Sequence, residues 1–511
     1  MSLAVAAAAL LVSGTSVGQM HVNERGLGET LIFPFYTSAN GNDTNIHITN
    51  TTDQVKAVKV RFLEAMNSQE VLDFNLYLSP EDVWTGTVTA NPNGTGAMIR
   101  TIDNSCTVPA LGSSGGANIG ELAGDAVPQP DGSIIRTQPF VNFKYLTDAN
   151  DTLARTSEGY LEVIEMGQID PTSDLGLATI HDANGRPADC DALVAAWTST
   201  TAGGITILGE WQFDSQQDFL PTWDGGGLYG YGVLLNVNEG ASVGADATAI
   251  DSFYDDIVEP NLHTAPGSDL PNLADANLDV AIFDEGDVEN YEFSEGADAV
   301  SALIMTANIS NDYVIDPVVN ALTDWVITMP TKRFYVQQTP ATAPFVTPWD
   351  GATGTACEPV AIDTWDREEA FVPDVPGSDG PVFSPQPPNI IIETDDFVLC
   401  TEVNVLGFGA TSAVNATDNI FYGFNAQIVA DGFIDGWARL SFLAADLNDP
   451  SSAAAPARQV ESVNGDIFNG LPAIGFAVFN YQNGTLDGGS VLANYASSIE
   501  HKTAPDVDSP Q

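Results

Sequence analysis

The sequence predicts a mainly β protein, with two or more antiparallel β-sandwich domains of the Ig-like or jelly-roll-like kind and long acidic loops. Three observations support this fold class. Apolar residues alternate with polar ones over several runs, clusters of turn-forming residues separate these runs, and helical periodicity is scarce. The chain has 511 residues, of which 44% are hydrophobic and 16% are charged, so it can bury a core despite a net charge of −54.

The clearest strands lie within residues 29–88. In residues 58–62 apolar side chains alternate with Lys59 and Arg61, and residues 72–78 alternate in the same way. A period of two predicts half-buried strands with one face on a core. Turn clusters bound these strands, as expected in a β-sandwich.

Weaker patterns predict the remaining elements. Further strands are expected at residues 160–166, 231–237, 325–329, 333–337, 421–429, 438–443 and 474–481. Two short helices are expected at residues 191–199 and 298–308.

Composition suggests how the chain is divided. Residues 1–20 resemble a secretory signal peptide, because an apolar run is followed by small residues. A stretch that holds six prolines, residues 372–389, is typical of an extended spacer. We therefore expect an N-terminal β-sandwich region at 21–371, which can hold two subdomains, a C-terminal β-rich region at 390–504, and a tail at 505–511. No later apolar run reaches the roughly 18 residues of a transmembrane segment.

The charge balance narrows the range of partners. There are 69 Asp and Glu against 15 Lys and Arg. Nucleic acid is not expected as a partner, because its phosphates need a basic surface that this chain lacks. Self-repulsion on this scale destabilises a compact state unless salt screens it or cations bind, so the composition suits salty water or a calcium-rich exterior.

The four cysteines are Cys106, Cys190, Cys357 and Cys400. Their even number and the absence of a CxxC pair fit an oxidising compartment. Three connectivities are possible, and we favour Cys106–Cys190 with Cys357–Cys400 because each closes a loop within one half of the chain. Buried free thiols are the alternative.

Calcium is the cation that the acidic segments suit best, since it prefers clustered oxygen ligands. Two clusters are the candidate sites, formed by Asp284, Asp287 and Glu289 and by Glu393, Asp395 and Asp396. Neither has the residue order of an EF-hand, and solvated acidic loops are the alternative reading. No two of the five histidines have metal-ligand spacing, so a transition-metal site is not expected.

One motif suggests catalysis. Residues 240–244 match G-x-S-x-G, which would make Ser242 a nucleophile, with Asp251 or Asp255 as acid and His263 or His501 as base. The same pattern recurs twice in this Gly- and Ser-rich chain, and there is no alternating βαβ background. We therefore assign no catalytic residue and expect a protein that is not an enzyme.

Trp211, Trp223 and Trp349 are candidates for stacking on sugars, with packing in a core or loop as the more common role of such residues.

Four segments carry a resemblance to a known family. They are residues 26–86, which begin GLGETLIFPFYTSANGNDTNIHITN, residues 323–336, TDWVITMPTKRFYV, and two runs near the end, GFAVFNYQNGTL and NYASSIEHK. Together they resemble an uncharacterised family of exported proteobacterial proteins. The resemblance implies export and an envelope or surface location, and it implies no activity and no site residues.

The expected function is that of a secreted, acidic structural protein of the cell surface, an S-layer-like or filament-forming subunit whose assembly depends on cations. Self-association is expected through sheet edges or divalent cations. A secreted adhesin that binds cell-surface glycans is the main alternative, and a serine hydrolase is a further one.

Overall fold

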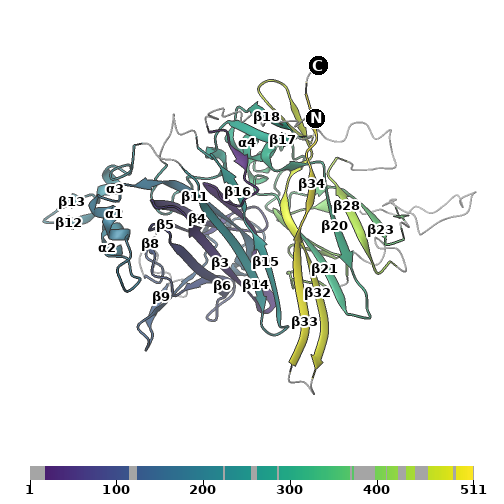
Figure 1. Ribbon diagram of the computed structural model, residues 1–511, viewed down its shortest axis with the longest axis horizontal. Helices are drawn as coiled ribbons and strands as arrows, with labels where there is room; N and C mark the ends of the chain where they lie inside the picture. Colours follow the sequence, from purple (N-terminus) through teal and green to yellow (C-terminus); the bar gives the residue numbers. More distant parts are fainter. Residues whose placement is uncertain are drawn as a thin grey trace, which may run out of the picture.

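The computed structural model describes residues 18–113, 124–221, 225–254, 262–284, 287–368, 371–372, 398–409, 411–423, 433–443, 458–486 and 491–509. In this part of the chain the fold is mainly β, as predicted, and two sandwiches lie side by side (Figure 1). All strand pairs in the named sheets are antiparallel except β26 with β27. No helix in the described ranges is long and apolar enough to cross a bilayer.

Two seven-stranded sheets form the N-terminal sandwich. Sheet I has the order β1 (His21–Val22), β16 (Thr248–Asp251), β2 (Thr30–Thr37), β11 (Glu158–Ile169), β4 (Val55–Glu64), β5 (Glu70–Leu78) and β8 (Cys106–Val108). Sheet II has the order β15 (Ala241–Asp246), β14 (Leu228–Asn236), β3 (Asn42–Asn50), β6 (Val83–Ala90), β7 (Ala97–Thr101), β10 (Ile134–Pro139) and β9 (Asp125–Pro128).

The alternating residues of β4 build the core between these sheets. Val58, Val60 and Phe62 pack there with Phe74 of β5 and Trp84 of β6, and all five side chains are buried. The period of two thus correctly identifies the apolar face of β4.

Two five-stranded sheets form the C-terminal sandwich. Sheet III has the order β24 (Phe371–Val372), β23 (Ala361–Asp366), β28 (Asp435–Ser441), β20 (Asn308–Val314) and β34 (Lys502–Ala504). Sheet IV has the order β27 (Phe421–Gly423), β26 (Val403–Gly407), β21 (Ala321–Thr328), β32 (Ile474–Leu486) and β33 (Val491–Glu500). Trp325, Ile362 and Leu440 lie in the core between them.

A third core joins the two sandwiches. Ile32 and Ile164 of sheet I pack there in one cluster with Val326, Val405 and Phe476 of sheet IV. Sheet I is therefore covered on both faces, and every residue of β2, β4 and β11 is buried.

Short elements fill the remaining space. The helices are α1 (Asp174–Thr179), α2 (Cys190–Ala196), α3 (Glu210–Phe213), α4 (Gly296–Leu303) and α5 (Arg333–Val336). The small β pairings are β12 (Thr200–Ala202) with β13 (Ile205–Ile207), β17 (Asp279–Asp284) with β18 (Asp287–Glu292), β19 (Met305–Thr306) with β31 (Leu471–Pro472), β22 (Glu358–Pro359) with β25 (Val398–Leu399), and β30 (Ile467–Asn469) with β29 (Gln459–Glu461) and β35 (Val507–Asp508).

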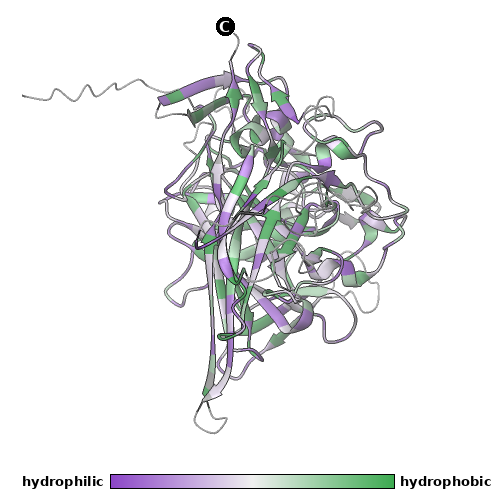
Figure 2. Ribbon diagram, turned by 90° about the vertical axis from the view of Figure 1, so that its right-hand side faces the viewer, coloured by the Kyte–Doolittle hydropathy of each residue, from purple (hydrophilic) through white to green (hydrophobic). Residues whose placement is uncertain are grey.

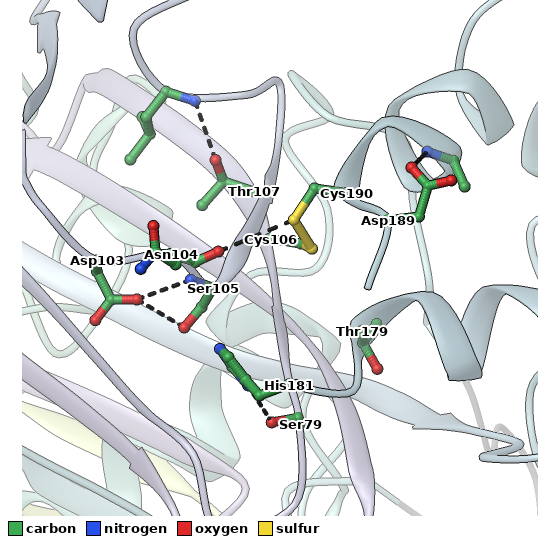
Figure 3. The surroundings of a disulfide bond; sticks show 12 residues. Ser79, Asp103, Asn104, Ser105, Cys106, Thr107, Thr179, His181, Asp189 and Cys190 are labelled. Atoms are coloured by element: carbon green, nitrogen blue, oxygen red, sulfur yellow. Dashed lines mark hydrogen bonds between the residues drawn. A yellow bond between two sulfur atoms is a disulfide. The ribbon is translucent and has the colours of Figure 1, made fainter. Parts of the chain in front are cut away.

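Both favoured disulfides are present. Cys106 of β8 bonds to Cys190 at the start of α2, which fixes the small helices to the edge of sheet I (Figure 3). Cys357 bonds to Cys400. Each crosslink restricts the conformations of the unfolded chain. A typical disulfide raises the free energy of unfolding by about 2–4 kcal/mol in this way.

Most predicted elements are confirmed. Residues 160–166, 231–237, 325–329, 438–443 and 474–481 lie largely or wholly in β11, β14, β21, β28 and β32, and the predicted helix at 191–199 corresponds to α2. The predicted helix at 298–308 corresponds to α4 only up to Leu303, because the chain then enters β19 and β20.

The prediction of a strand at residues 333–337 is wrong, because α5 lies there. This single helical turn follows Pro330, and the buried contacts of Arg333 with sheet I override the strand-like pattern. Of the strand expected at 421–429, β27 covers the first three residues and the rest lies outside the described residues.

Strand pairing also shows where along the chain the N-terminal sandwich ends and the C-terminal sandwich begins. β23 pairs with β28, and β21 pairs with β26 and β32, so strands on both sides of residue 380 share sheets. The change from one sandwich to the other falls between β18 and β20 instead. Residues 1–17 and 373–397, which hold most of the signal-like segment and all but the first residue of the expected spacer, lie outside the described residues, whereas Met20 of the signal-like segment is buried in a core.

Candidate functional site

The polar side chains of β4 are buried rather than exposed. The sequence pattern predicts a half-buried strand, but the second face of sheet I is covered, so Lys59 and Arg61 are removed from water. Lys59 Nζ lies 3.3 Å from Asp73 Oδ2, and Arg61 Nη2 lies 3.0 Å from Glu70 Oε2. A buried charge is tolerated when it is paired in this way.

Buried cations recur throughout the molecule. Seven of the fifteen Lys and Arg are buried, namely Lys56, Lys59, Arg61, Arg155, Lys332, Arg333 and Arg458. All of these except Lys332 have a carboxylate within 4 Å. The protein thus places nearly half of its scarce positive charge in the interior.

Glu162 of β11 is the centre of the network that joins the two sandwiches. Its carboxylate accepts from Arg61 Nη1 of the same sheet at 3.2 Å and from Arg333 Nη2 of α5 at 2.9 Å. Arg333 Nη1 also donates to the hydroxyl of Tyr160 at 3.1 Å, and that hydroxyl lies 3.1 Å from the carbonyl oxygen of Pro330. One carboxylate therefore holds cations from both halves of the chain.

Glu402 lies in the same interface and is the least well paired of its charges. Its backbone N–H donates to the carbonyl oxygen of Ala65 at 3.0 Å, which places the side chain in the interior. Neither carboxylate oxygen has a hydrogen bond of good geometry within the described residues. Burial raises the pKa of Glu402 to about 8, although Lys332, Arg333 and the nearby Ser68 hydroxyl oppose the shift.

The properties of the neighbouring groups agree with a protonated, neutral Glu402. Burial lowers the pKa of Lys332 to about 8, and its Nζ donates to the carbonyl oxygen of Ala356 at 2.7 Å instead of to a carboxylate. Glu158, at another point of the interface, accepts from Thr417 N at 2.9 Å, and burial raises the pKa of Glu158 to about 7. The interface therefore contains carboxyl groups that lose their proton only in neutral or alkaline solution.

The G-x-S-x-G motif does not form a nucleophile elbow. Ser242 lies exposed in β15, an extended strand that pairs with β14, and not in a strand-to-helix turn. Both ring nitrogens of His263 are engaged, by the Tyr77 hydroxyl and the Ser215 carbonyl, and those of His501 by Asn311 and the Val326 carbonyl. The described residues thus do not bring Ser242 to a base; Asp255 lies outside them.

Burial also lowers the pKa of His263 to about 3 and that of His501 to about 4. Both imidazoles are therefore neutral in ordinary solution, and they act as hydrogen-bonding members of the core.

Of the three tryptophans predicted to stack on sugars, the structure describes Trp211 and Trp349, and neither is fully exposed. Trp211 is buried in an aromatic cluster with Tyr77 and His263, and its Nε1 donates to the carbonyl oxygen of Gln217 at 3.0 Å. Trp349 is partly buried against the C-terminal core. Trp223 lies outside the described residues.

The calcium candidates fall at the β17–β18 hairpin and in an undescribed segment. Asp287 and Glu289 are exposed on β18, whereas the Asp284 side chain lies outside the described part. Glu393, Asp395 and Asp396 lie outside it as well. Within the described ranges, no group of three or more His, Cys, Asp or Glu is arranged to hold a metal ion.

A groove of about 1420 Å³ runs along the seam between the sandwiches. Its ionisable side chains are Glu24, Arg25, Tyr229, Asp246, Glu500 and His501, of which His501 is already hydrogen-bonded. Phe283 and other apolar side chains complete the lining. The groove has the interdomain position that binding sites favour, and among the described residues that line it no nucleophile is paired with a base.

Comparison with known proteins adds no assignment. No protein-family model, no curated protein and no solved structure matches this chain.

Sequence reasoning missed the interface residues Glu162, Arg333 and Glu402. A signal was present for part of the network: three of the fifteen cations occur in the strand at residues 55–64, whose other residues are apolar except for Glu64. Such clustering in a core strand indicates paired burial.

We expect Arg333→Met to destabilise the protein by about 3 kcal/mol, because Glu162 loses a partner that it needs in the interior. Urea unfolding followed by tryptophan fluorescence measures the loss. Lys144→Met is the matched control, since the Lys144–Asp269 pair is largely exposed and contributes at most about 1 kcal/mol. Equal effects of the two substitutions would contradict the role assigned to Glu162.

We expect the free energy of unfolding to fall as the pH rises from about 5 to 9. Glu402 has a folded-state pKa above its unfolded value, so the folded state holds the proton more tightly and loses that advantage as the pH passes about 8. Glu402→Gln replaces the carboxyl group with a neutral amide of nearly the same shape. It should match the wild type at pH 5 and be more stable by about 1–3 kcal/mol at pH 9.

The control for this pH series is Glu24→Gln, which changes an exposed carboxylate. Urea unfolding at each pH gives the comparison. If Glu402→Gln destabilised the protein at pH 9, the ionised Glu402 carboxylate would be a counter-charge that the folded state needs, and the prediction would be wrong.

Proposed function

We propose that this protein is an exported structural subunit of the cell surface, S-layer-like or filament-forming, whose copies join when cations or salt screen their charge. The observation that carries the proposal is the division of charge between interior and surface. Seven of the fifteen Lys and Arg are buried, whereas only nine of the described Asp and Glu are. Outside the interior, acidic side chains therefore outnumber basic ones by a larger ratio than in the sequence as a whole.

Such a surface makes association depend on the solvent. Two copies repel each other until salt shortens the screening length to about 8 Å at physiological ionic strength. Divalent cations act more strongly, because they can bridge carboxylates of two copies without a preformed pocket in either. Asp287 and Glu289, exposed on β18, are candidates for such bridging.

The build of the molecule suits a structural role. Two sandwiches share a buried interface that contains apolar packing and ion pairs, so the subunit behaves as one block. Two disulfides support a location in an oxidising compartment, as do the signal-like first 20 residues.

We expect the purified chain to be monomeric in low salt with chelator and to form ordered sheets or filaments in millimolar calcium chloride. Light scattering measures the size, and negative-stain microscopy shows the order. Magnesium chloride and sodium chloride at matched ionic strength are the controls, since sodium alone tests screening. Monomers under every one of these conditions would contradict a self-assembling role.

A second candidate function, glycan binding, is favoured by Trp437 of β28. Its side chain is 39% exposed, and one ring face stacks on Trp365 of β23 with centroids 3.9 Å apart. Trp365 is the only ring stacked on Trp437 within the described residues. Asp312 of β20 lies opposite Trp437 in the sheet and is exposed, so a polar strand borders the ring. Neutral pyranosides bind at such places. One face of the sugar ring stacks on the aromatic ring, and the sugar hydroxyl groups form hydrogen bonds with the polar side chains beside it.

We expect Trp437→Ala to abolish any binding to an array of neutral oligosaccharides, because the stacking face is lost. Tyr229→Ala, at an exposed aromatic of the other sandwich, should leave that binding unchanged. An array without signal for the wild type, or a signal that survives Trp437→Ala, would count against this candidate.

A further inference from the structure

The edges of the four large sheets differ greatly in length. Seven of the eight edge strands are short: β1, β8, β9, β15, β24, β27 and β34 have between two and six residues. β33 has ten, at the edge of sheet IV. Short edge strands are one of the ways in which proteins prevent sheets from joining. The other seven edges have this protection, and β33 lacks it.

Charge gives β33 no protection either. Residues 467–499 contain a single charged side chain, Asp487, in a chain of which 16% of residues are charged. Within β33 the one charge is Glu500, at its end. By contrast, the short edges β9, β15 and β34 carry Asp125, Asp246 and Lys502.

β33 is the last strand of sheet IV, and it also packs against β15 of the N-terminal sandwich. The β32–β33 hairpin extends beyond the rest of the described chain in both views (Figures 1 and 2). One face rests on the N-terminal sandwich, where the side chains of Asn494 and Ser498 donate to the carbonyl oxygens of Glu239 and Gly244. β32 is the only strand that pairs with β33 among the described residues.

The other face of β33 carries an exposed apolar stripe. Val491 is 49% exposed, Tyr495 62% and Ile499 43%. They share a face because strand side chains alternate, and they are evenly spaced about Tyr495. In an antiparallel pair of two β33 strands centred on Tyr495, Val491 of each copy would lie opposite Ile499 of the other, and the two Tyr495 side chains would face each other. The stripe is thus complementary to itself, as a two-fold contact requires.

We propose that β33 is the strand through which two copies of this chain join, edge to edge and antiparallel, so that sheet IV continues from one copy into the next. The inference rests on the proposed self-association and names its contact. The partner is a second copy because the stripe is complementary to itself and because this hairpin carries little charge, so two strongly anionic molecules can approach closely there.

Two substitutions at Tyr495 test this contact under conditions in which the wild type assembles. Tyr495→Lys places a like charge at the centre of both strands, and we expect at least a tenfold loss of assembled material in light scattering. Tyr495→Cys introduces the only free thiol, since all four native cysteines are in disulfides, and we expect a disulfide-linked dimer on mild oxidation.

The controls are Tyr229→Lys and Tyr229→Cys, at an exposed aromatic on β14, which should assemble normally and not crosslink. Circular dichroism checks that each variant is folded. Normal assembly of Tyr495→Lys without crosslinking of Tyr495→Cys would overturn the assignment of β33 and leave self-association standing on another surface. A wild type that never assembles would instead contradict the proposed function and this contact together.

Discussion

The shared carboxylate of Glu162 is the contact on which the arrangement of the two sandwiches depends. It pairs with Arg61 from its own sheet and with Arg333 from the C-terminal half. A buried ion pair contributes little net stability compared with apolar packing, but leaving one of its members alone is costly. The network therefore selects one docking of the sandwiches against others that would bury the same apolar area.

This docking explains why sheet I is buried on both faces and why its polar residues are internal. An antiparallel sheet commonly keeps one face in water, and the alternation in β4 suggests that arrangement. Here the outward face meets sheet IV and the small helices, so Lys59 and Arg61 find carboxylates instead of solvent. Nearly half of the few cations therefore lie in the interior, most of them paired with acids, and the basic side chains that remain outside are few.

The sequence predicts the fold class, most strands and two helices because periodicity is a local signal, and it predicts both disulfides because each closes a loop within one half of the chain. It does not predict α5, since the turn at Arg333 is set by contact with Glu162, some 170 residues away in the chain. It also does not predict Glu402 as a buried, poorly paired acid, because nothing in its neighbours specifies what covers it. The candidate site fails to emerge from sequence for this reason: its parts come from strands far apart in the chain.

The placement of the cations has a consequence for survival outside the cell. Trypsin-like proteases cut after Lys or Arg and need a segment of chain that can open into their active site. Eight of the fifteen such residues lie at or near the surface, and the other seven are buried in the interior. Cleavage at those seven requires local or global unfolding first, so the folded chain offers this large class of enzymes few places to begin.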